Sequence, residues 1–404
     1  MKLLKSTHFF FELLLALRRA GLVGEKLSAL VVYIVGTSRL LERPLCLFIK
    51  GPSGVGKNFL GDTVLGFLPP SHVLQLTSSS TRSWNYLERK LEHKAVYVKE
   101  RNEAAGPVHP TRLLISEKEL VHIVTVKKGG RFVSQRRVTK GPIASISTTT
   151  KDRVEVDDET RHISIWLDDS PDQTVRVMEA AVVEQKSLEA TERRVWHKVQ
   201  QLIQKRAALP IELPDWFKNL VPHVRSDNLW ARRYFPAFLQ ACRTVALIRS
   251  FHRDEQQLRK AGRILVRFTD FAITAMVFNP VFGQSLDRAD EEDLQTQQHV
   301  RRISARKGRG VSAIDLAAQM EISTDRAYSL LRKAVGAGTI FRANQTSKAN
   351  LKLYLPTKPR PFLPDPAELF QKLEGLPEQV RFVHPLTGKW VTYSRERQDA
   401  RPRF

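Results

Sequence analysis

The sequence predicts a multidomain α/β protein whose main domain is a three-layer α/β/α sandwich around a parallel sheet. Short apolar runs alternate with helical segments over residues 1–170, and this alternation is typical of strands joined by covering helices. A glycine-rich turn joins one of these runs to a helix. The length of 404 residues is sufficient for several domains, each with its own core.

Apolar runs and helix breakers set the order of elements in this main domain. A helical segment at 25–39 ends before Pro44, and a second at 57–67 is stopped by Pro69 and Pro70. The domain is expected to end soon after Trp166–Asp169. Strands are expected at 45–50, 73–77, 95–98 and 143–147.

Two further strand-like runs, 120–126 and 131–138, are joined by a short basic and glycine-rich turn. Gly129 and Gly130 supply the positive φ that a tight hairpin needs. Lysine is a point charge suited to phosphates, so the turn is a candidate for DNA backbone contacts. A solvated edge protected by lysine is the alternative. The candidate DNA contacts are Lys127, Lys128 and Arg131.

Prolines and charge runs divide the rest of the chain. A continuous helix is expected over 175–206, followed by a linker punctuated by Pro210, Pro214 and Pro222, and a helical block at 229–281. Acidic residues at 287–293 mark the next boundary. The expected segments are 1–44 (N-terminal helical), 45–170 (α/β domain), 171–290 (helical lid and linker), 291–356 (compact basic domain) and 357–404 (Pro-rich basic tail).

The compact basic domain has the pattern of a winged helix, an α+β fold. Ser312 and Ser323 are candidate N-caps of two successive helices, and Gly336 and Gly338 end the second. Strands at 339–343 and 351–355 would then form the wing. Such domains bind DNA or dock proteins. Candidate DNA contacts are Arg326, Arg332, Lys333, Arg342, Lys348 and Lys352.

The charge balance points to a polyanionic partner. The formal net charge is +23 and the pI is near 10.2, which favours nucleic acid, with a solvated basic surface or an anionic membrane surface as alternatives. Two cysteines exclude a disulfide framework and suit a reducing, cytoplasmic location. The first 20 residues resemble a signal peptide, but Glu12 interrupts the apolar run, so we expect an amphipathic helix and no membrane span.

The strongest motif is a phosphate-binding loop between the 45–50 strand and the 57–67 helix. Its glycines let backbone N–H groups surround phosphate oxygens at a helix N-terminus, and Lys57 would reach the β- and γ-phosphates. A glycine turn without phosphate is the alternative. The predicted nucleotide-binding residues are Gly51, Pro52, Ser53, Gly54, Val55, Gly56, Lys57 and Asn58.

The metal side of this motif is altered. Asn58 stands where a Ser or Thr hydroxyl normally binds Mg²⁺. After the 95–98 strand, Glu100 occupies the position of the water-activating carboxylate, but Lys99 replaces the acidic residue that helps to hold the metal. We therefore expect ATP and Mg²⁺ as ligands, with the metal held through ATP, Asn58 as a candidate ligand, and no site made by protein ligands alone.

The chain resembles the AAA+ helicase modules of bacterial, phage and mobile-element primase–helicase proteins, which are similar to MCM helicases. The segments that carry the likeness are 30–58, 92–100, 141–150, Glu159-Thr160-Arg161, Asp168-Asp169-Ser170, Ala231-Arg232-Arg233 and the winged helix. The resemblance implies an ATP-driven hexameric ring that encircles DNA. It places the basic hairpin in the channel, and any primase would be a separately encoded chain, because no primase half is present.

The resemblance also assigns roles around the nucleotide. It implies that Thr148 and Thr149 lie near the γ-phosphate sensor position and that Arg161 is a finger inserted into the neighbouring subunit's site. A surface salt bridge of Arg161 with Asp157, Asp158 or Glu159 is the alternative.

The leading interpretation is an MCM-like DNA helicase or translocase that acts in replication of a phage or mobile element. A hydrolysis-deficient nucleotide-binding scaffold or loader is the alternative, with Asn58 and Lys99 as the discriminating residues. A transcription regulator fits the long helical middle poorly.

Overall fold

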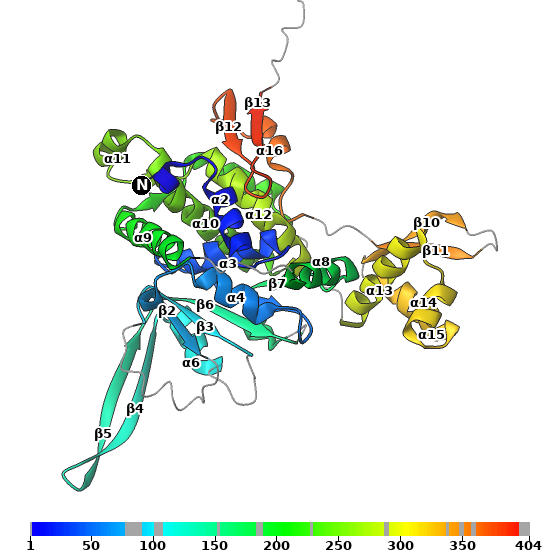
Figure 1. Cartoon of the computed structure of the whole chain (residues 1–404), viewed down its shortest axis with the longest axis horizontal. Coiled ribbons are helices and arrows are strands. Elements are labelled where there is room, and N and C mark those ends of the chain that lie inside the picture. The colour runs from blue at the N-terminus through cyan, green and yellow to red at the C-terminus, as the bar shows by residue number, and fades with distance from the viewer. Residues whose placement is uncertain are drawn as a thin grey trace, which may run out of the picture. The chain divides into compact units, whose positions relative to one another are not determined.

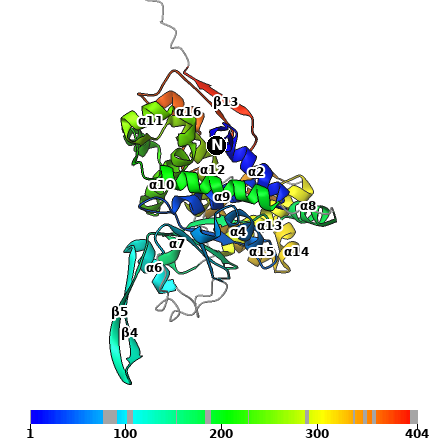
Figure 2. The same cartoon turned by 60° about the vertical axis from the view of Figure 1, so that its left-hand side comes forward.

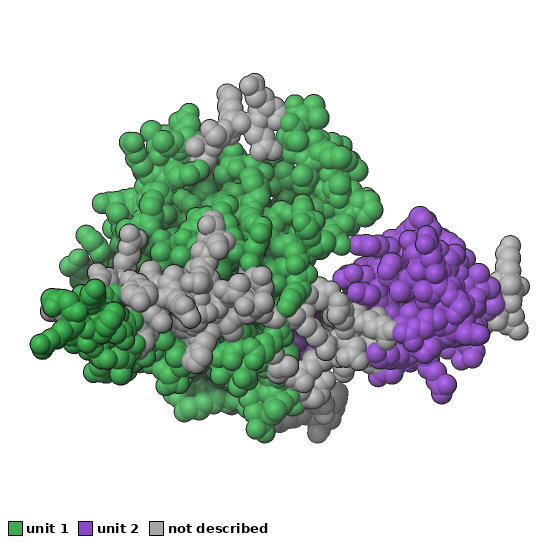
Figure 3. All heavy atoms as spheres, turned by 90° about the horizontal axis from the view of Figure 1, so that it is seen from below, with its two compact units in different colours: residues 1–281, 363–404 green, residues 282–362 purple. Residues whose placement is uncertain are grey.

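The protein consists of two compact units, coloured separately in Figure 3. Unit 1 comprises residues 1–281 and 363–404, and unit 2 comprises residues 282–362. The expected 291–356 domain lies within unit 2. The computed structural model describes residues 2–76, 91–100, 108–151, 154–182, 189–226, 229–286, 291–336, 339–346, 351–356 and 361–395.

Unit 1 is built around a five-stranded parallel sheet with the order β2-β3-β6-β1-β7. The glycine-rich turn follows β1, which lies next to the edge strand β7, and leads into α4. Each of the expected strands begins and ends within two residues of its predicted bounds, and β7 completes the sheet at its edge. The bounds are β1 (Leu47–Lys50), β2 (Val73–Leu76), β3 (Lys94–Val98), β6 (Ile143–Thr149) and β7 (Ile163–Trp166).

Helices cover both faces of the sheet, as expected for three layers. On one face, α4 (Lys57–Leu65) approaches Tyr97 of β3 so closely that a Cβ on Gly61 would lie 2.3 Å from the tyrosine hydroxyl. On the other face, α6 (Val108–Ser116) packs Leu114 against Val96. Successive residues of a strand point to opposite faces, and both views show α4 and α6 on opposite sides (Figures 1 and 2).

The N-terminal segment forms core helices of unit 1. In α2 (Phe9–Arg19) one face is buried and Arg18 and Arg19 are exposed, which confirms an amphipathic helix. In α3 (Lys26–Ser38) almost every side chain is buried, as in a helix surrounded by protein. Within the described residues, no helix is both long enough and apolar enough to cross a membrane.

The region after the sheet differs from its prediction. The continuous helix expected over 175–206 is interrupted: α8 covers Pro171–Val182, and α9 (Ala190–Arg206) starts only after Glu189, whose backbone is extended. The expected proline linker is also structured. Its residues include a 3-10 helix, η2 (Asp215–His223), which buries Trp216 against Phe271, so apolar packing outweighed the breaking effect of the prolines.

The helical block beyond the linker holds further elements that the apolar pattern did not reveal. The two-residue strand β8 of the linker pairs in parallel with β9 of the block, and the block is otherwise largely helical, as expected. The bounds are β8 (Ile211–Glu212), α10 (Ala231–Ile248), η3 (Arg249–His252), α11 (Glu255–Ala261), β9 (Ile264–Leu265) and α12 (Phe268–Leu286).

The segment expected as a Pro-rich tail folds onto unit 1 through residue 395. Pro366 is the first residue of α16 (Pro366–Lys372), where proline is well tolerated, and the Asp365 side chain caps the helix. The Asn279 side chain exchanges two 2.6 Å hydrogen bonds with the Leu363 backbone. A hairpin of β12 (Gln379–Val383) and β13 (Trp390–Ser394) completes the segment.

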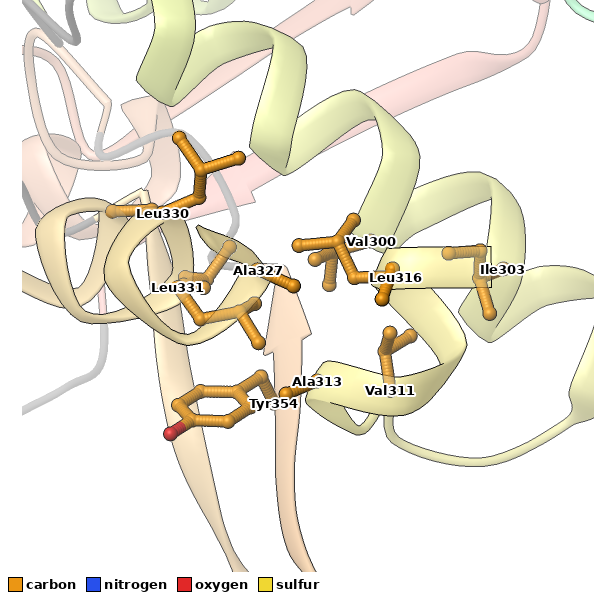
Figure 4. Close-up of a cluster of buried hydrophobic side chains, with 12 residues drawn as sticks. Val300, Ile303, Val311, Ala313, Leu316, Ala327, Leu330, Leu331 and Tyr354 are labelled. Atoms are coloured by element: carbon orange, nitrogen blue, oxygen red, sulfur yellow. The ribbon is translucent and has the colours of Figure 1, made fainter. Parts of the chain in front are cut away.

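Unit 2 contains three helices and a hairpin around its own core (Figure 4). Ser312 caps the second helix in a capping box with Asp315, and Ser323 accepts a hydrogen bond from the Arg326 backbone at the start of the third, so both predicted caps are confirmed. An isolated antiparallel bridge pairs Val311 with Tyr354 of β11. The bounds are α13 (Glu291–Lys307), α14 (Ala313–Met320), α15 (Thr324–Gly336), β10 (Ile340–Thr346) and β11 (Lys352–Pro356).

Candidate nucleotide site and basic surfaces

The loop between β1 and α4 has the backbone geometry of a phosphate cradle. Gly51, Gly54 and Gly56 have φ of 144°, 83° and 96°, conformations that residues with a Cβ rarely adopt. The loop ends at the N-terminus of α4, where orphan N–H groups and the helix dipole favour an anion.

Lys57 lies across the loop rather than in solvent. Its ammonium donates to the Gly51 carbonyl at 2.8 Å and to the Pro52 carbonyl at 2.7 Å. Burial lowers the pKa of Lys57, and the carboxylate of Glu100 partly offsets this effect. A cation held beside a glycine-rich loop at a helix N-terminus is an arrangement suited to phosphate oxygens.

A buried ion pair supports the strand end beneath the loop. The Lys50 ammonium is 2.5 Å from the Glu159 carboxylate, and their side chains are 0% and 10% exposed. The Glu159 carboxylate also accepts from the Ser164 hydroxyl at 2.8 Å and from the Val154 backbone at 3.3 Å. The last residue of β1 is therefore fixed from within the protein, directly before the first loop glycine.

On the metal side, three residues form a closed hydrogen-bonded network. The Thr148 hydroxyl donates to the Asn58 amide oxygen at 2.8 Å and accepts from the Glu100 N–H at 2.8 Å. The Asn58 amide nitrogen donates to the Glu100 carboxylate at 3.3 Å. The structure thus brings together three predicted site residues from α4, β6 and the end of β3, and the amide oxygen of Asn58 already has a donor.

Lys99 has a different partner. Its ammonium is 2.7 Å from the Asp62 carboxylate, on the second turn of α4, and lies 5.9 Å from the Tyr97 ring centroid. The carboxylate is 42% exposed and also accepts from Gln75 at 3.2 Å. The ammonium of Lys99 is therefore compensated by Asp62.

A cavity of about 820 Å³ adjoins the loop. Its walls come from three parts of the chain: the turn before α3, the loop with the start of α4, and the segment from the end of β7 into α8. The walls are mainly apolar, and the volume lies in the usual range for small-molecule sites. The apolar side chains of these walls include Leu22, Val23, Phe59, Leu167, Val177 and Met178.

The cavity walls are tied together by polar contacts that sequence reasoning missed. The Gln173 amide donates to the Val23 carbonyl at 2.8 Å, and the Asp168 N–H donates to the Glu25 carboxylate at 2.6 Å. Gly24 has a φ of 67°, a conformation that favours glycine, and a Cβ there would lie 2.4 Å from the Gln173 amide oxygen. No motif marks these residues, because they become neighbours only in the folded chain.

The remaining predicted nucleotide-site residues lie elsewhere. The Thr149 hydroxyl accepts from the Lys151 N–H at 3.1 Å, rather than joining the network of Thr148. Within one chain, Arg161 is 3.8 Å from the Asp157 carboxylate and 3.3 Å from the Ser116 hydroxyl, which is the salt-bridge alternative. Arg233 contacts the Thr160 hydroxyl, and Arg232 is exposed.

The basic hairpin forms as predicted from its glycines. Strands β4 (Glu119–Lys128) and β5 (Arg131–Lys140) pair over their full length, and Gly129 and Gly130 both have positive φ, 57° and 80°. The hairpin projects from unit 1 in both views (Figures 1 and 2). Lys127 and Arg131 are exposed near its tip.

In unit 2, the candidate basic residues lie on exposed positions of α15 and the hairpin. Arg326, Arg332 and Lys333 are exposed on α15, outside the stripe of residues that includes the buried Ala327 and Leu331. Arg342 and Lys352 are exposed on β10 and β11. The predicted contact Lys348 lies outside the described residues.

The chain has likenesses among solved structures, although no family model and no curated protein sequence matches it. Similar solved structures include a candidate ATPase from Cytophaga hutchinsonii, at 14% identity over 80% of this chain and 93% of that one, with a TM-score of 0.38. A full-length MCM homologue from Methanopyrus kandleri matches at 12% identity over 68% of this chain and 59% of that one, with a TM-score of 0.40.

A third similar structure is the active helicase Cch of SCCmec type IV. It matches at 10% identity over 82% of this chain and 66% of that one, with a TM-score of 0.30. The chain thus spans less than two thirds of the length of this helicase and of the MCM homologue.

Proposed function

We propose that unit 1 binds ATP, with the triphosphate on residues 51–57 and the base in the adjoining cavity. The observation that carries this proposal is the position of the Lys57 ammonium over a loop of positive-φ glycines at the N-terminus of α4. A phosphate would offer that ammonium a charge-assisted acceptor stronger than the neutral carbonyls it now contacts. The apolar cavity walls suit the faces of a nucleobase.

The residues around the loop also suit Mg²⁺ delivered with the nucleotide. The metal neutralises charge on the phosphates when it is bound. Glu100 is the one carboxylate within the network of Asn58 and Thr148, and it is exposed toward solvent. Its place at the end of β3 supports a role in orienting water, with Thr148 positioning its backbone.

We extend the proposal to a DNA motor: an AAA+, MCM-like helicase or translocase that works as a hexameric ring in replication of a phage or mobile element, alongside a separate primase. The support is the combination of the nucleotide site with two basic elements, the β4–β5 hairpin and the exposed face of α15. Three helices, a hairpin and an isolated bridge between Val311 and Tyr354 support the proposal that unit 2 is a winged helix. In the ring, the Arg161 guanidinium would leave Asp157 and contact the nucleotide that the neighbouring subunit binds.

A second candidate function is a nucleotide-binding scaffold or loader that does not hydrolyse ATP. The observation that favours it is the closed network at Asn58, whose amide oxygen and nitrogen are both engaged by Thr148 and Glu100. Lys99 also favours the scaffold, because it occupies the position of an acidic residue that would help to hold the metal. Its ammonium is paired with Asp62.

The nucleotide proposal is tested by Lys57→Ala in the full chain. We expect ATP affinity, measured by calorimetry, to fall about 100-fold or more, equivalent to about 2.7 kcal/mol. The matched control is Lys118→Ala, which removes a half-exposed lysine paired with Glu42 near the other end of the sheet. If Lys57→Ala binds ATP as well as the parent protein, the site assignment is wrong.

The motor and the scaffold differ in turnover. A motor should hydrolyse ATP in the presence of Mg²⁺, faster when single-stranded DNA is added, and should separate strands. A parent protein that binds ATP with no measurable turnover, with or without DNA, would favour the scaffold.

The DNA role of unit 2 is tested by charge reversal on α15. The double change Arg332→Glu and Lys333→Glu should weaken duplex binding and reduce the salt slope by roughly one unit for each phosphate that these side chains no longer neutralise. Arg301→Glu with Arg306→Glu, on exposed positions of α13, gives the same change in net charge. Equal effects of the two double variants would indicate a general charge effect, and no effect of either would make unit 2 a protein-docking module.

A further inference from the structure

The β4–β5 hairpin has one face turned to unit 1 at its base and one face that is exposed along its length. Cross-strand partners share a face in an antiparallel pair. On the covered face, Leu120 and Val124 are 4% and 5% exposed, and Leu120 packs with Leu114 of α6. The opposite, outer face is formed by Val121, Ile123, Thr125, Lys127, Phe132, Ser134, Arg136 and Val138.

The outer face carries an aromatic ring in an unusual position. Phe132 is 76% exposed, next to the tip of a ribbon that extends about 30 Å by the length of its strands. Ile123 on the same face is 72% exposed. The Thr125–Ser134 pair separates Ile123 from Phe132 on this face, so the ring stands apart from the other exposed apolar side chains.

Cationic side chains lie on the same face as this ring, and the sequence around them has no acidic residue. Lys127 is the direct cross-strand partner of Phe132, and Arg136 lies on the same face, opposite Ile123. From Leu120 to Lys151 the sequence contains no Asp or Glu. An exposed aromatic ring beside a lysine, with a further cation along the same face and no carboxylate nearby, has the chemistry of a platform for a polynucleotide.

We propose that Phe132 stacks on an unpaired base of a single-stranded nucleic acid, while Lys127 binds an adjacent phosphate. A single strand is the partner because its bases offer free π-faces, whereas duplex bases are already stacked on one another. This inference rests on the proposed DNA role of the hairpin and deepens it: the tip distinguishes single strands from duplex, and it does so without sequence preference. A second copy of this chain is the other conceivable occupant of the outer face.

The test uses the full chain and a fluorescently labelled oligo(dT), with a duplex of equal length as the second probe. Phe132→Ala should weaken oligo(dT) binding about tenfold, which corresponds to about 1.4 kcal/mol. Duplex affinity should stay within twofold, because α15 and the hairpin of unit 2 are proposed to hold the duplex. The salt slope should not change, since no charge is removed. Phe132→Trp should restore binding.

Ile123→Ala is the matched control, because it removes an equally exposed apolar side chain from the same face without removing a ring. It should leave oligo(dT) binding within twofold. A comparable loss for Ile123→Ala and Phe132→Ala, together with a smaller oligomer in light scattering, would overturn the proposal in favour of a contact between copies. Thermal unfolding of both variants should match that of the parent, since both side chains are largely exposed.

The proposed DNA role of the hairpin and the stacking of Phe132 on a base can be tested separately. If Lys127→Ala with Lys128→Ala weakens oligo(dT) binding while Phe132→Ala does not, the stacking proposal is wrong and the DNA role of the hairpin stands. If neither variant changes oligo(dT) binding, both are wrong. ATP affinity, which depends on Lys57, should be unchanged in all of these variants.

Discussion

The two sides of the candidate nucleotide site each contain a lysine paired with a carboxylate, but the two pairs lie in very different surroundings. On the phosphate side, Lys50 and Glu159 are 2.5 Å apart and nearly inaccessible to solvent. On the metal side, Lys99 and Asp62 are 2.7 Å apart, with side chains 19% and 42% exposed. The first pair holds the end of β1 in place by a contact inside the protein. The second pair lies at the surface, where water can replace each partner.

Under the proposed function, this difference would separate nucleotide binding from nucleotide hydrolysis. The phosphate side has the residue types and backbone geometry that an anion requires. The metal side departs from the expected residue types at two positions, and its amide, hydroxyl and carboxylate groups bond to one another. A site of this kind can hold a nucleotide through the first half while the second half decides whether it is cleaved.

The largest effect is expected from breaking the buried pair. Glu159→Gln leaves the Lys50 ammonium buried without a counter-charge and should lower the free energy of unfolding of unit 1 by about 3 kcal/mol. The measurement is the midpoint of urea unfolding, converted with the slope of the transition. Glu155→Gln is the control, since that carboxylate belongs to the Arg112 pair and is 60% exposed.

A Glu159→Gln variant as stable as Glu155→Gln would contradict the conclusion that the buried pair is the stronger of the two. It would mean that Lys50 is stabilised by other contacts, such as the Trp166 ring 5.0 Å from its ammonium.

A smaller effect is expected from restoring the metal side. Asn58→Thr with Lys99→Asp should raise ATP turnover at least about tenfold, equivalent to ~1.4 kcal/mol of barrier. The threonine hydroxyl can coordinate Mg²⁺, the aspartate adds the missing negative charge, and loss of the amide frees Glu100. Turnover is measured with saturating ATP and Mg²⁺, and Lys57→Ala in the same background should abolish it.

The opposite result would also be informative. A parent protein with vigorous turnover that the double change leaves unaltered would show that the metal side works as it stands, and the scaffold would be eliminated.

The sequence could predict those features that depend on residues close together in the chain. The phosphate loop, the hairpin turn at Gly129 and Gly130, and the cap at Ser312 are local patterns with local causes, and the structure has each of them. The Asn58 substitution was visible, but its hydrogen bonds to Thr148 and Glu100 were not, because these residues meet only when β3 and β6 pair.

Features that depend on tertiary packing could not be predicted from the sequence. The cavity beside the loop is assembled from three separated segments whose apolar residues look like ordinary core. Pro366 suggested an extended tail, although it starts a helix that packs Phe370 against Phe268 of the core. In each case burial of apolar surface against a distant partner decided the outcome over local propensity.

The smallest effect is expected from Asp62→Asn, the same carboxylate-to-amide change made on the exposed pair. It should alter the free energy of unfolding by less than about 1 kcal/mol, because solvent screens an exposed ion pair and the flexible lysine loses little when its partner is neutralised. The amide oxygen can still accept from Gln75, which further limits the loss. Urea unfolding beside Glu159→Gln, in one buffer, gives the two values on one scale. A gap of about 2 kcal/mol between them would sharpen the comparison. Equal losses would show instead that Lys99 depends on Asp62 as strongly as Lys50 depends on Glu159, and the metal side would then be as firmly built as the phosphate side.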